Sequence, residues 1–135
     1  MRKRSVLVAD ELERHIMRCR RRQEPAAVLV LRFVAPGRIS PERLRACFRL
    51  TDSVAVTRTR YGYELVGVFD EDGLDRDALE WRLRCALDAP ATCVSWARFP
   101  DDGVTLETLL DDARAALPVP VVPSSRRAGA LHLWA

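Results

Sequence analysis

The chain has 135 residues, a formal net charge of +3 and a hydrophobic fraction of 48%. This length and apolar content predict a single folded domain and exclude a chain that is disordered throughout. No apolar run approaches the roughly 18 residues of a membrane span, so we expect a cytoplasmic protein. Lys3 is the only lysine among 22 basic residues. The excess of arginine over lysine indicates biased codon usage. Nucleic-acid binding is not favoured, because 19 acidic residues are interspersed with the arginines.

The first half of the chain predicts a helix, a buried strand and a second helix. Residues 10–22 place acids at the start and arginines at the end of an amphipathic pattern, which is typical of a helix, and Asp10 is the expected N-cap. The apolar run 27–34 indicates a central strand covered on both faces. Ser40 and Pro41 supply an N-cap and a first-turn proline, so a second helix is expected to end near Leu50.

The second half predicts a hairpin, a helix, a strand and a last helix. Residues 53–59 and 63–69 have the composition of two strands joined by a short turn. An amphipathic helix is expected over about 75–88, and a strand over 91–98. Thr105 caps a last helix that ends near residue 117. Both internal tryptophans, Trp81 and Trp96, are expected in the core.

The resulting order is a helix, a β-α-β-β-α-β unit, a further helix and a tail. This unit is the ferredoxin-like arrangement, an α+β fold with an antiparallel sheet, its first strand in the middle and helices on one face. We expect one domain over 1–117 and a proline-rich tail over 118–135, extended or forming a short edge strand. The apolar residues near the end of that tail are hard to bury within one small domain and favour contact with another chain. They are Leu131, Leu133 and Trp134.

The cysteines and histidines show no pattern of a metal or catalytic site. No two cysteines have the C-x2-C spacing of zinc sites, and the two histidines lie at opposite ends of the chain. No nucleophile–base pair is therefore suggested, and the cysteines are most simply small buried apolar residues. We expect no metal, no cofactor and no catalytic residue. The residues concerned are His15, Cys19, Cys47, Cys85, Cys93 and His132.

Four stretches, taken together in their order and spacing, resemble a GGDEF domain, the diguanylate cyclase family. Residues 11–31 look like that family's first helix and first strand, and 49–55 are similar to the segment before its signature hairpin. Residues 60–66 stand where the signature loop should be, and 91–117 resemble the last core strand and helix. The resemblance implies the nucleotide-cyclase variant of the ferredoxin-like fold.

The departures from this family concern its metal-binding and phosphate-binding residues. Cyclases of the family hold two Mg²⁺ ions with carboxylates, which neutralise the charge that develops in phosphoryl transfer. Arg32 stands where the first strand should supply one such acid. In the signature loop, tyrosines stand at Tyr61 and Tyr63 in place of a glycine and the metal-binding acid, while Gly62 and Glu64 remain. The resemblance therefore implies a degenerate GGDEF-like domain without cyclase activity.

Two functions from different classes stay open. The first is a protein-interaction module that forms a homodimer or binds another signalling protein, through the altered loop and the apolar tail. The second is a receptor for cyclic di-GMP or another nucleotide. Arg49 and Asp52 have the R-x-x-D form of the family's product-binding motif, in which arginine pairs with guanine or phosphate and aspartate accepts from guanine. The alternative for this pair is structural, with Asp52 capping a turn.

Overall fold

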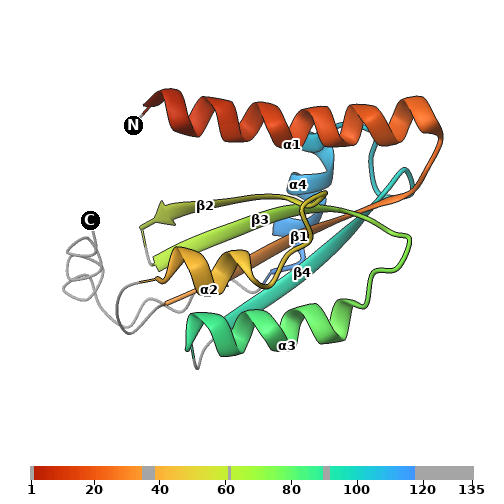
Figure 1. The fold of residues 1–135 in the computed structure, drawn as a ribbon. Coiled ribbons are helices and arrows are strands. Elements are labelled where there is room, and N and C mark those ends of the chain that lie inside the picture. Colours follow the sequence, from red (N-terminus) through yellow and green to blue (C-terminus); the bar gives the residue numbers. More distant parts are fainter. Residues whose placement is uncertain (1, 35–38, 61, 90–91, 118–135) are drawn as a thin grey trace.

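The computed structural model describes residues 2–34, 39–60, 62–89 and 92–117, and for residues 2–9 it describes the backbone alone. The described ranges form four helices and four strands, and Figure 1 shows how they are arranged. None of the described helices is both long enough and apolar enough to cross a membrane. The elements are α1 (Arg2–Arg22), β1 (Ala26–Phe33), α2 (Pro41–Arg45), β2 (Ser53–Thr59), β3 (Gly62–Asp70), α3 (Arg76–Leu87), β4 (Thr92–Phe99) and α4 (Leu106–Ala115).

The four strands form one antiparallel sheet in the order β2-β3-β1-β4. The central strand β1 is almost entirely buried and pairs along its whole length with both neighbours. This order, with the first strand of the unit inside the sheet, confirms the predicted α+β, ferredoxin-like class. The register also sets the positions used below, since Arg32 on β1 lies directly opposite Glu64 on β3.

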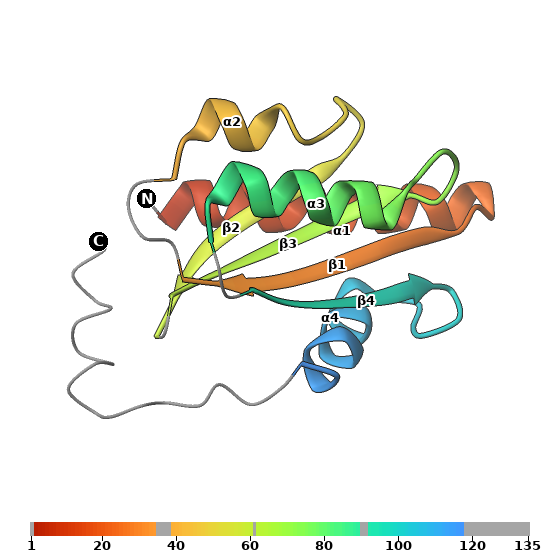
Figure 2. The same ribbon diagram turned by 90° about the horizontal axis from the view of Figure 1, so that it is seen from below.

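Helices cover both faces of the sheet: α2 and α3, the helices of the β-α-β-β-α-β unit, share one face as predicted, and the additional helices α1 and α4 cover the other. Helices α1 and α4 pack on one face, where Val28 and Val30 of β1 join their core. Helices α2 and α3 lie over the other face, and Leu29 and Leu31 of β1 point to that side. Figures 1 and 2 show α1 and α3 on opposite sides of the strands. Both apolar faces follow from the sequence of β1. Alternate residues of a strand point to opposite faces, and residues 26–31 are all apolar.

Two predicted helix boundaries are corrected. Helix α1 begins at Arg2, so Asp10 lies inside the helix and does not cap it. Helix α2 begins as expected, with the Ser40 hydroxyl accepting a hydrogen bond from the Arg43 amide, but it ends at Arg45 and not near Leu50. The amides of Cys47 and Phe48 then bond to the carbonyls of Leu44 and Arg45, three residues back, and this tighter turn ends the α-helix.

One predicted core residue and two predicted buried thiols lie elsewhere. Trp81 is 67% exposed. The buried face of α3 consists of Leu79, Leu83 and Leu87 and is narrower than the apolar face predicted from the sequence. Trp96 is partly buried against that cluster. Cys19 and Cys47 are buried as expected, whereas Cys85 is exposed and Cys93 is half-buried. The Thr105 cap of α4 is confirmed.

Candidate functional site

Glu64, the acid of the segment that resembles the signature loop, is held by two arginines. Glu64 lies near the start of β3 and is 5% exposed. Arg32 of β1 donates from Nε to Glu64 Oε2 at 3.1 Å. Arg114 of α4 donates from Nη2 to Oε1 at 2.6 Å and from Nε to Oε2 at 3.3 Å. Both carboxylate oxygens of Glu64 therefore already have cationic donors.

The charges around Glu64 decide its ionisation. Burial by itself would raise the pKa of this carboxyl, but the hydrogen bonds and positive charges of Arg114 and Arg32 outweigh it and hold the pKa below its ordinary value of 4.5. A Mg²⁺ pair needs several free oxygen ligands. One carboxylate engaged by two guanidinium groups does not provide them, so the residues present at this position do not fit the metal pair of a cyclase.

The structure describes three of the four residues 61–64 that resemble the signature loop. Gly62 has φ +147°, and a Cβ at this position would lie 2.4 Å from the carbonyl oxygen of Phe33. The close approach of the Gly62 backbone to the Phe33 backbone thus explains why this position is a glycine. The ring of Tyr63 stacks on Phe33 with a centroid distance of 5.5 Å. Tyr61 lies outside the described residues.

The two residues of the predicted R-x-x-D motif contact each other. The Arg49 Nε lies 3.3 Å from Asp52 Oδ1, and the Arg49 amide donates to Asp52 Oδ2 at 2.7 Å. The Arg49 guanidinium also donates to the backbone carbonyls of Asp72 at 3.2 Å and Asp70 at 3.3 Å. In this geometry the motif joins the turn before β2 to the end of β3. The predicted tail residues Leu131, Leu133 and Trp134 lie outside the described residues.

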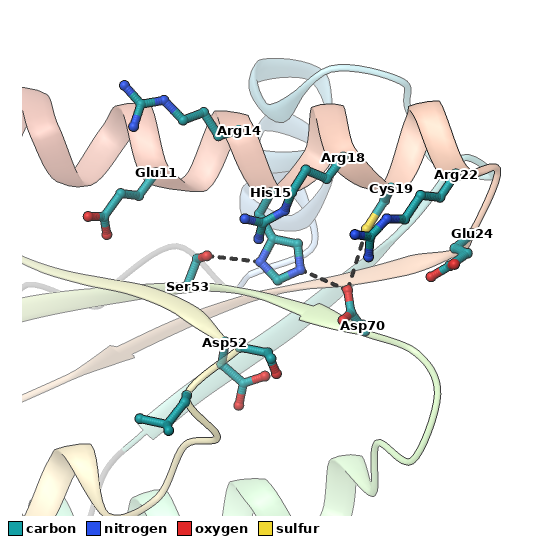
Figure 3. Close-up of a pocket in the computed structure, with 12 residues that line it drawn as sticks. Glu11, Arg14, His15, Arg18, Cys19, Arg22, Glu24, Asp52, Ser53 and Asp70 are labelled. Carbon is teal, nitrogen blue, oxygen red and sulfur yellow. Dashed lines mark hydrogen bonds and ion pairs between the residues drawn. The ribbon is translucent and has the colours of Figure 1, made fainter.

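A cavity of about 550 Å³ lies between α1 and the neighbouring ends of β2 and β3. Figure 3 shows His15 of α1 in this cavity, directed toward the two strands. Its Nδ1 lies 2.9 Å from the Ser53 hydroxyl, and its Nε2 lies 2.8 Å from Asp70 Oδ1. The residues that line the cavity are Glu11, Arg14, His15, Arg18, Cys19, Arg22, Glu24, Leu50, Thr51, Asp52, Ser53 and Asp70.

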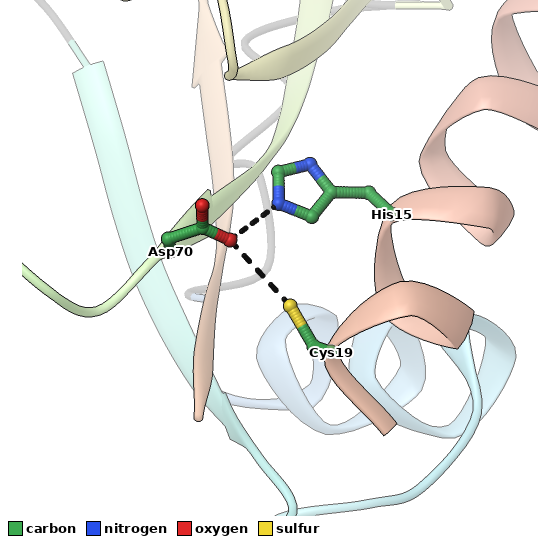
Figure 4. A group of neighbouring side chains, drawn as sticks. All are labelled: His15, Cys19 and Asp70. Carbon is green, nitrogen blue, oxygen red and sulfur yellow. Dashed lines mark hydrogen bonds and ion pairs between the residues drawn. The ribbon is translucent and has the colours of Figure 1, made fainter. Parts of the chain in front are cut away.

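Cys19 completes the polar cluster at the α1–β3 contact. Its Sγ lies 3.5 Å from the same Asp70 oxygen that His15 contacts, as Figure 4 shows. Burial, together with the Asp70 charge, raises the pKa of the Cys19 thiol to about 11. Burial by itself would raise the pKa of Asp70, but the hydrogen bond and charge of His15 lower it below its ordinary value of 3.8.

Sequence reasoning missed this cluster for a definable reason. It looked for C-x2-C spacing and for a second histidine, whereas the local signal is His15 and Cys19 four residues apart on one helix. Such a pair shares a helix face. The third member, Asp70, lies 51 residues after Cys19. Only the pairing of β1 with β3 brings it under α1.

Comparison with solved structures identifies the class of fold as that of GGDEF domains. The GGDEF domain of YfiN, or TpbB, from Pseudomonas aeruginosa aligns with a TM-score of 0.58 and 19% identity over 84% of this chain and 85% of that one. A sensory box/GGDEF family protein from Caulobacter crescentus gives 0.54 and 20% identity over 82% and 86%. A DGC protein from Thermotoga maritima gives 0.53 and 15% identity over 82% and 91%.

At these identities the alignments establish the fold, and with it the predicted resemblance to the GGDEF domain is confirmed at the level of structure. No family matches the sequence when it is scanned against known protein families. No curated protein is significantly similar to it in sequence.

Proposed function

We propose that this domain is a GGDEF-fold signalling module that forms no cyclic dinucleotide and acts through contact with another protein chain. The observation that carries the proposal is the engagement of Glu64 by Arg32 and Arg114. The proposal rests on charge, because the sheet end that a cyclase of this fold would use for metal ions here carries two cations and one anion.

The energetics of this ion pair oppose metal binding. A divalent cation at Glu64 would have to displace both arginines or lie against their positive charges, and repulsion between like charges a few ångströms apart is strong in a partly buried site. The removal of Arg32 and Arg114 would also break three hydrogen bonds to the buried carboxylate. Glu64 is accordingly assigned a structural role that joins β1, β3 and α4.

Contact with a partner is supported by apolar surface. Trp81, on the outer side of α3, is 67% exposed, and large exposed aromatic residues are enriched at protein interfaces. The apolar tail residues Leu133 and Trp134 are the second element of the proposed interface. We assign the partner as a second copy of this chain or another signalling protein.

The catalytic half of the proposal is tested by incubation of the full chain with GTP and either Mg²⁺ or Mn²⁺, followed by chromatographic separation of the nucleotides. We expect no cyclic di-GMP. Any turnover that scales with protein concentration and is lost in Glu64→Gln would contradict the proposal.

The interaction half is tested by sedimentation over a range of protein concentrations. We expect self-association, or binding to a captured signalling partner, that weakens in Trp81→Ser or in the double variant Leu133→Ser, Trp134→Ser. The matched control is Leu50→Ser, because Leu50 is exposed but lies on the turn before β2. Equal association of all variants would rule out these two surfaces.

A nucleotide receptor is the second candidate, and one observation favours it. The Asp52 side chain is 4% exposed, and its buried Oδ1 makes no hydrogen bond among the described residues, although Arg49 Nε lies 3.3 Å away as its ion-pair partner. Asp52 also lines the 550 Å³ cavity, opposite the arginines of α1. Calorimetry with cyclic di-GMP on the wild type and on Asp52→Asn tests this candidate. If the wild type gives no heat of binding, the nucleotide-receptor function is excluded.

A further inference from the structure

Three potential metal ligands meet where α1 crosses the end of β3. One ligand atom from each of His15, Cys19 and Asp70 lies within 4.8 Å of the other two. His15 and Cys19 are four residues apart on α1 and share its inner face, while Asp70 ends β3 on the sheet side that α1 covers (Figure 4). An imidazole nitrogen, a thiol sulfur and a carboxylate oxygen together form a donor set that suits zinc.

The distances in this cluster are close to those of a tetrahedral site. Zinc bonds of 2.0–2.3 Å at tetrahedral angles place neighbouring ligand atoms about 3.3–3.6 Å apart. Asp70 Oδ1 lies 3.5 Å from Cys19 Sγ and 2.8 Å from His15 Nε2. All three ligand atoms lie within 4.8 Å of one another, so side-chain rotations that move them by about an ångström admit the ion.

The orientation of the histidine is set by a second residue. The Ser53 hydroxyl lies 2.9 Å from His15 Nδ1. A hydroxyl both donates and accepts, so Ser53 can accept a hydrogen bond from Nδ1–H in the tautomer whose Nε2 lone pair is directed at the Asp70 side of the cluster. Metal-bound histidines usually have such a partner on their other nitrogen.

The charges of the cavity are compatible with a zinc ion bound by these ligands. Cys19 releases its thiol proton to solvent when the ion binds, and its thiolate together with the Asp70 carboxylate balances the two positive charges, so the occupied cluster of ion, thiolate and carboxylate is neutral. This matters because the cavity wall carries further charged groups of both signs, whose repulsion would oppose a bare dication. They are Arg14, Arg18 and Arg22, and Glu11, Glu24 and Asp52.

We propose that His15, Cys19 and Asp70 bind one zinc ion, with a water molecule from the cavity as the fourth ligand. All three residues line the cavity, which provides an entry path and room for that water. The ion joins α1 to the end of β3. The site goes beyond the proposed function and is independent of it, since Glu64 and its two arginines take no part.

Cobalt substitution in the full chain tests the site, after treatment with a chelator and desalting. Co²⁺ reports its ligands, because a thiolate gives a near-ultraviolet charge-transfer band and a tetrahedral site gives visible absorption. We expect one cobalt per chain, displaced by Zn²⁺, and loss of the band in Cys19→Ser. The matched control, Cys85→Ser, removes an exposed thiol and keeps the band. Ser53→Ala keeps the band and weakens metal affinity about 10- to 100-fold.

A wild type without a charge-transfer band at saturating Co²⁺ overturns the proposal. A band that survives Cys19→Ser but disappears in Cys85→Ser also overturns it, since the metal then binds the surface thiol. Because Cys19 is buried, circular dichroism checks that its variant folds, and Asp70→Asn provides a second test by thermal melting. We expect Zn²⁺ to raise the melting temperature of the wild type, and an equal rise in Asp70→Asn would show that the site is wrong.

Discussion

Arg32 and Glu64 are direct cross-strand partners on β1 and β3, joined by a 3.1 Å hydrogen bond from Nε to Oε2. The resemblance to cyclases assigns a metal-binding acid to the first of these positions. An arginine there reverses the charge, and Arg114 adds a second cation from α4. Glu64 therefore stabilises the contact between α4 and the sheet.

Glu64→Gln is expected to lower the free energy of unfolding by about 1–3 kcal/mol, because charged hydrogen bonds to a buried carboxylate are lost. Arg32 and Arg114 are each about one-third exposed, so water can partly replace Glu64 as their partner and limit the loss. Urea denaturation measures the effect. Glu13→Gln on the exposed side of α1 is the control and should change stability by less than about 0.5 kcal/mol. Equal stability of the two variants would contradict the structural role.

The stability of the domain is expected to fall in acid, partly through Glu64. The folded-state pKa of Glu64 lies below its ordinary value of 4.5, so its ionised form stabilises the fold above pH 4.5. That contribution is lost as the pH falls through the folded-state pKa. Unfolding by urea at a series of pH values should give a shallower acid decline for Glu64→Gln than for the wild type. Parallel declines would show that Glu64 does not titrate in this way.

Much of the fold was predictable because its signals are local. The Ser40 and Thr105 caps and the apolar run of β1 mark elements within a few residues. The start of α1 was missed because Asp10, a good N-cap type, lies inside the helix. Trp81 was misplaced because helical periodicity gives the direction of an apolar stripe but not its width.

The site was less predictable because its contacts join distant parts of the chain. Arg114 reaches Glu64 across 50 residues, and His15 reaches Asp70 across 55. Neither pair produces a pattern that can be recognised in a short stretch of sequence. The Arg49–Asp52 pair is local, and its pattern was found, but the pattern alone did not reveal that the Arg49 guanidinium also binds the carbonyls of Asp70 and Asp72.

Arg49→Ala is expected to destabilise the folded protein by about 1–2 kcal/mol in the absence of any nucleotide, because it removes hydrogen bonds and leaves a buried carboxylate at Asp52 without its cation. Arg49→Lys should restore only part of the loss, since an ammonium group lacks the forked geometry of guanidinium. Thermal and urea unfolding measure both. Arg58→Ala, at an exposed position of β2, is the control. Unchanged stability in Arg49→Ala would contradict a structural role for the pair.

Gly62→Ala is expected to destabilise the β2–β3 hairpin by about 2 kcal/mol or more, since the added Cβ meets backbone and the residue has an unfavourable φ. The Cβ would lie 2.4 Å from the Phe33 carbonyl oxygen. Gly73→Ala is the matched comparison, because Gly73 also has a positive φ but its Cβ would meet only the end of the Arg49 side chain at 3.6 Å. Its expected cost is about 1 kcal/mol. Similar losses for both variants would show that close packing is not what requires Gly62.

The four thiols are expected to react in an order set by their burial. In chelator-treated protein at pH 8, Cys85 should react first with a disulfide reagent, Cys93 more slowly, and Cys19 and Cys47 slowest. Cys19 combines burial with a pKa raised to about 11, so only about one thiol in a thousand is ionised at that pH. Absorbance and peptide mass mapping follow the reaction. Cys85→Ser should lack the fast phase, and in urea all four thiols should react quickly. Fast labelling of Cys19 in the folded protein would contradict its burial on the inner face of α1.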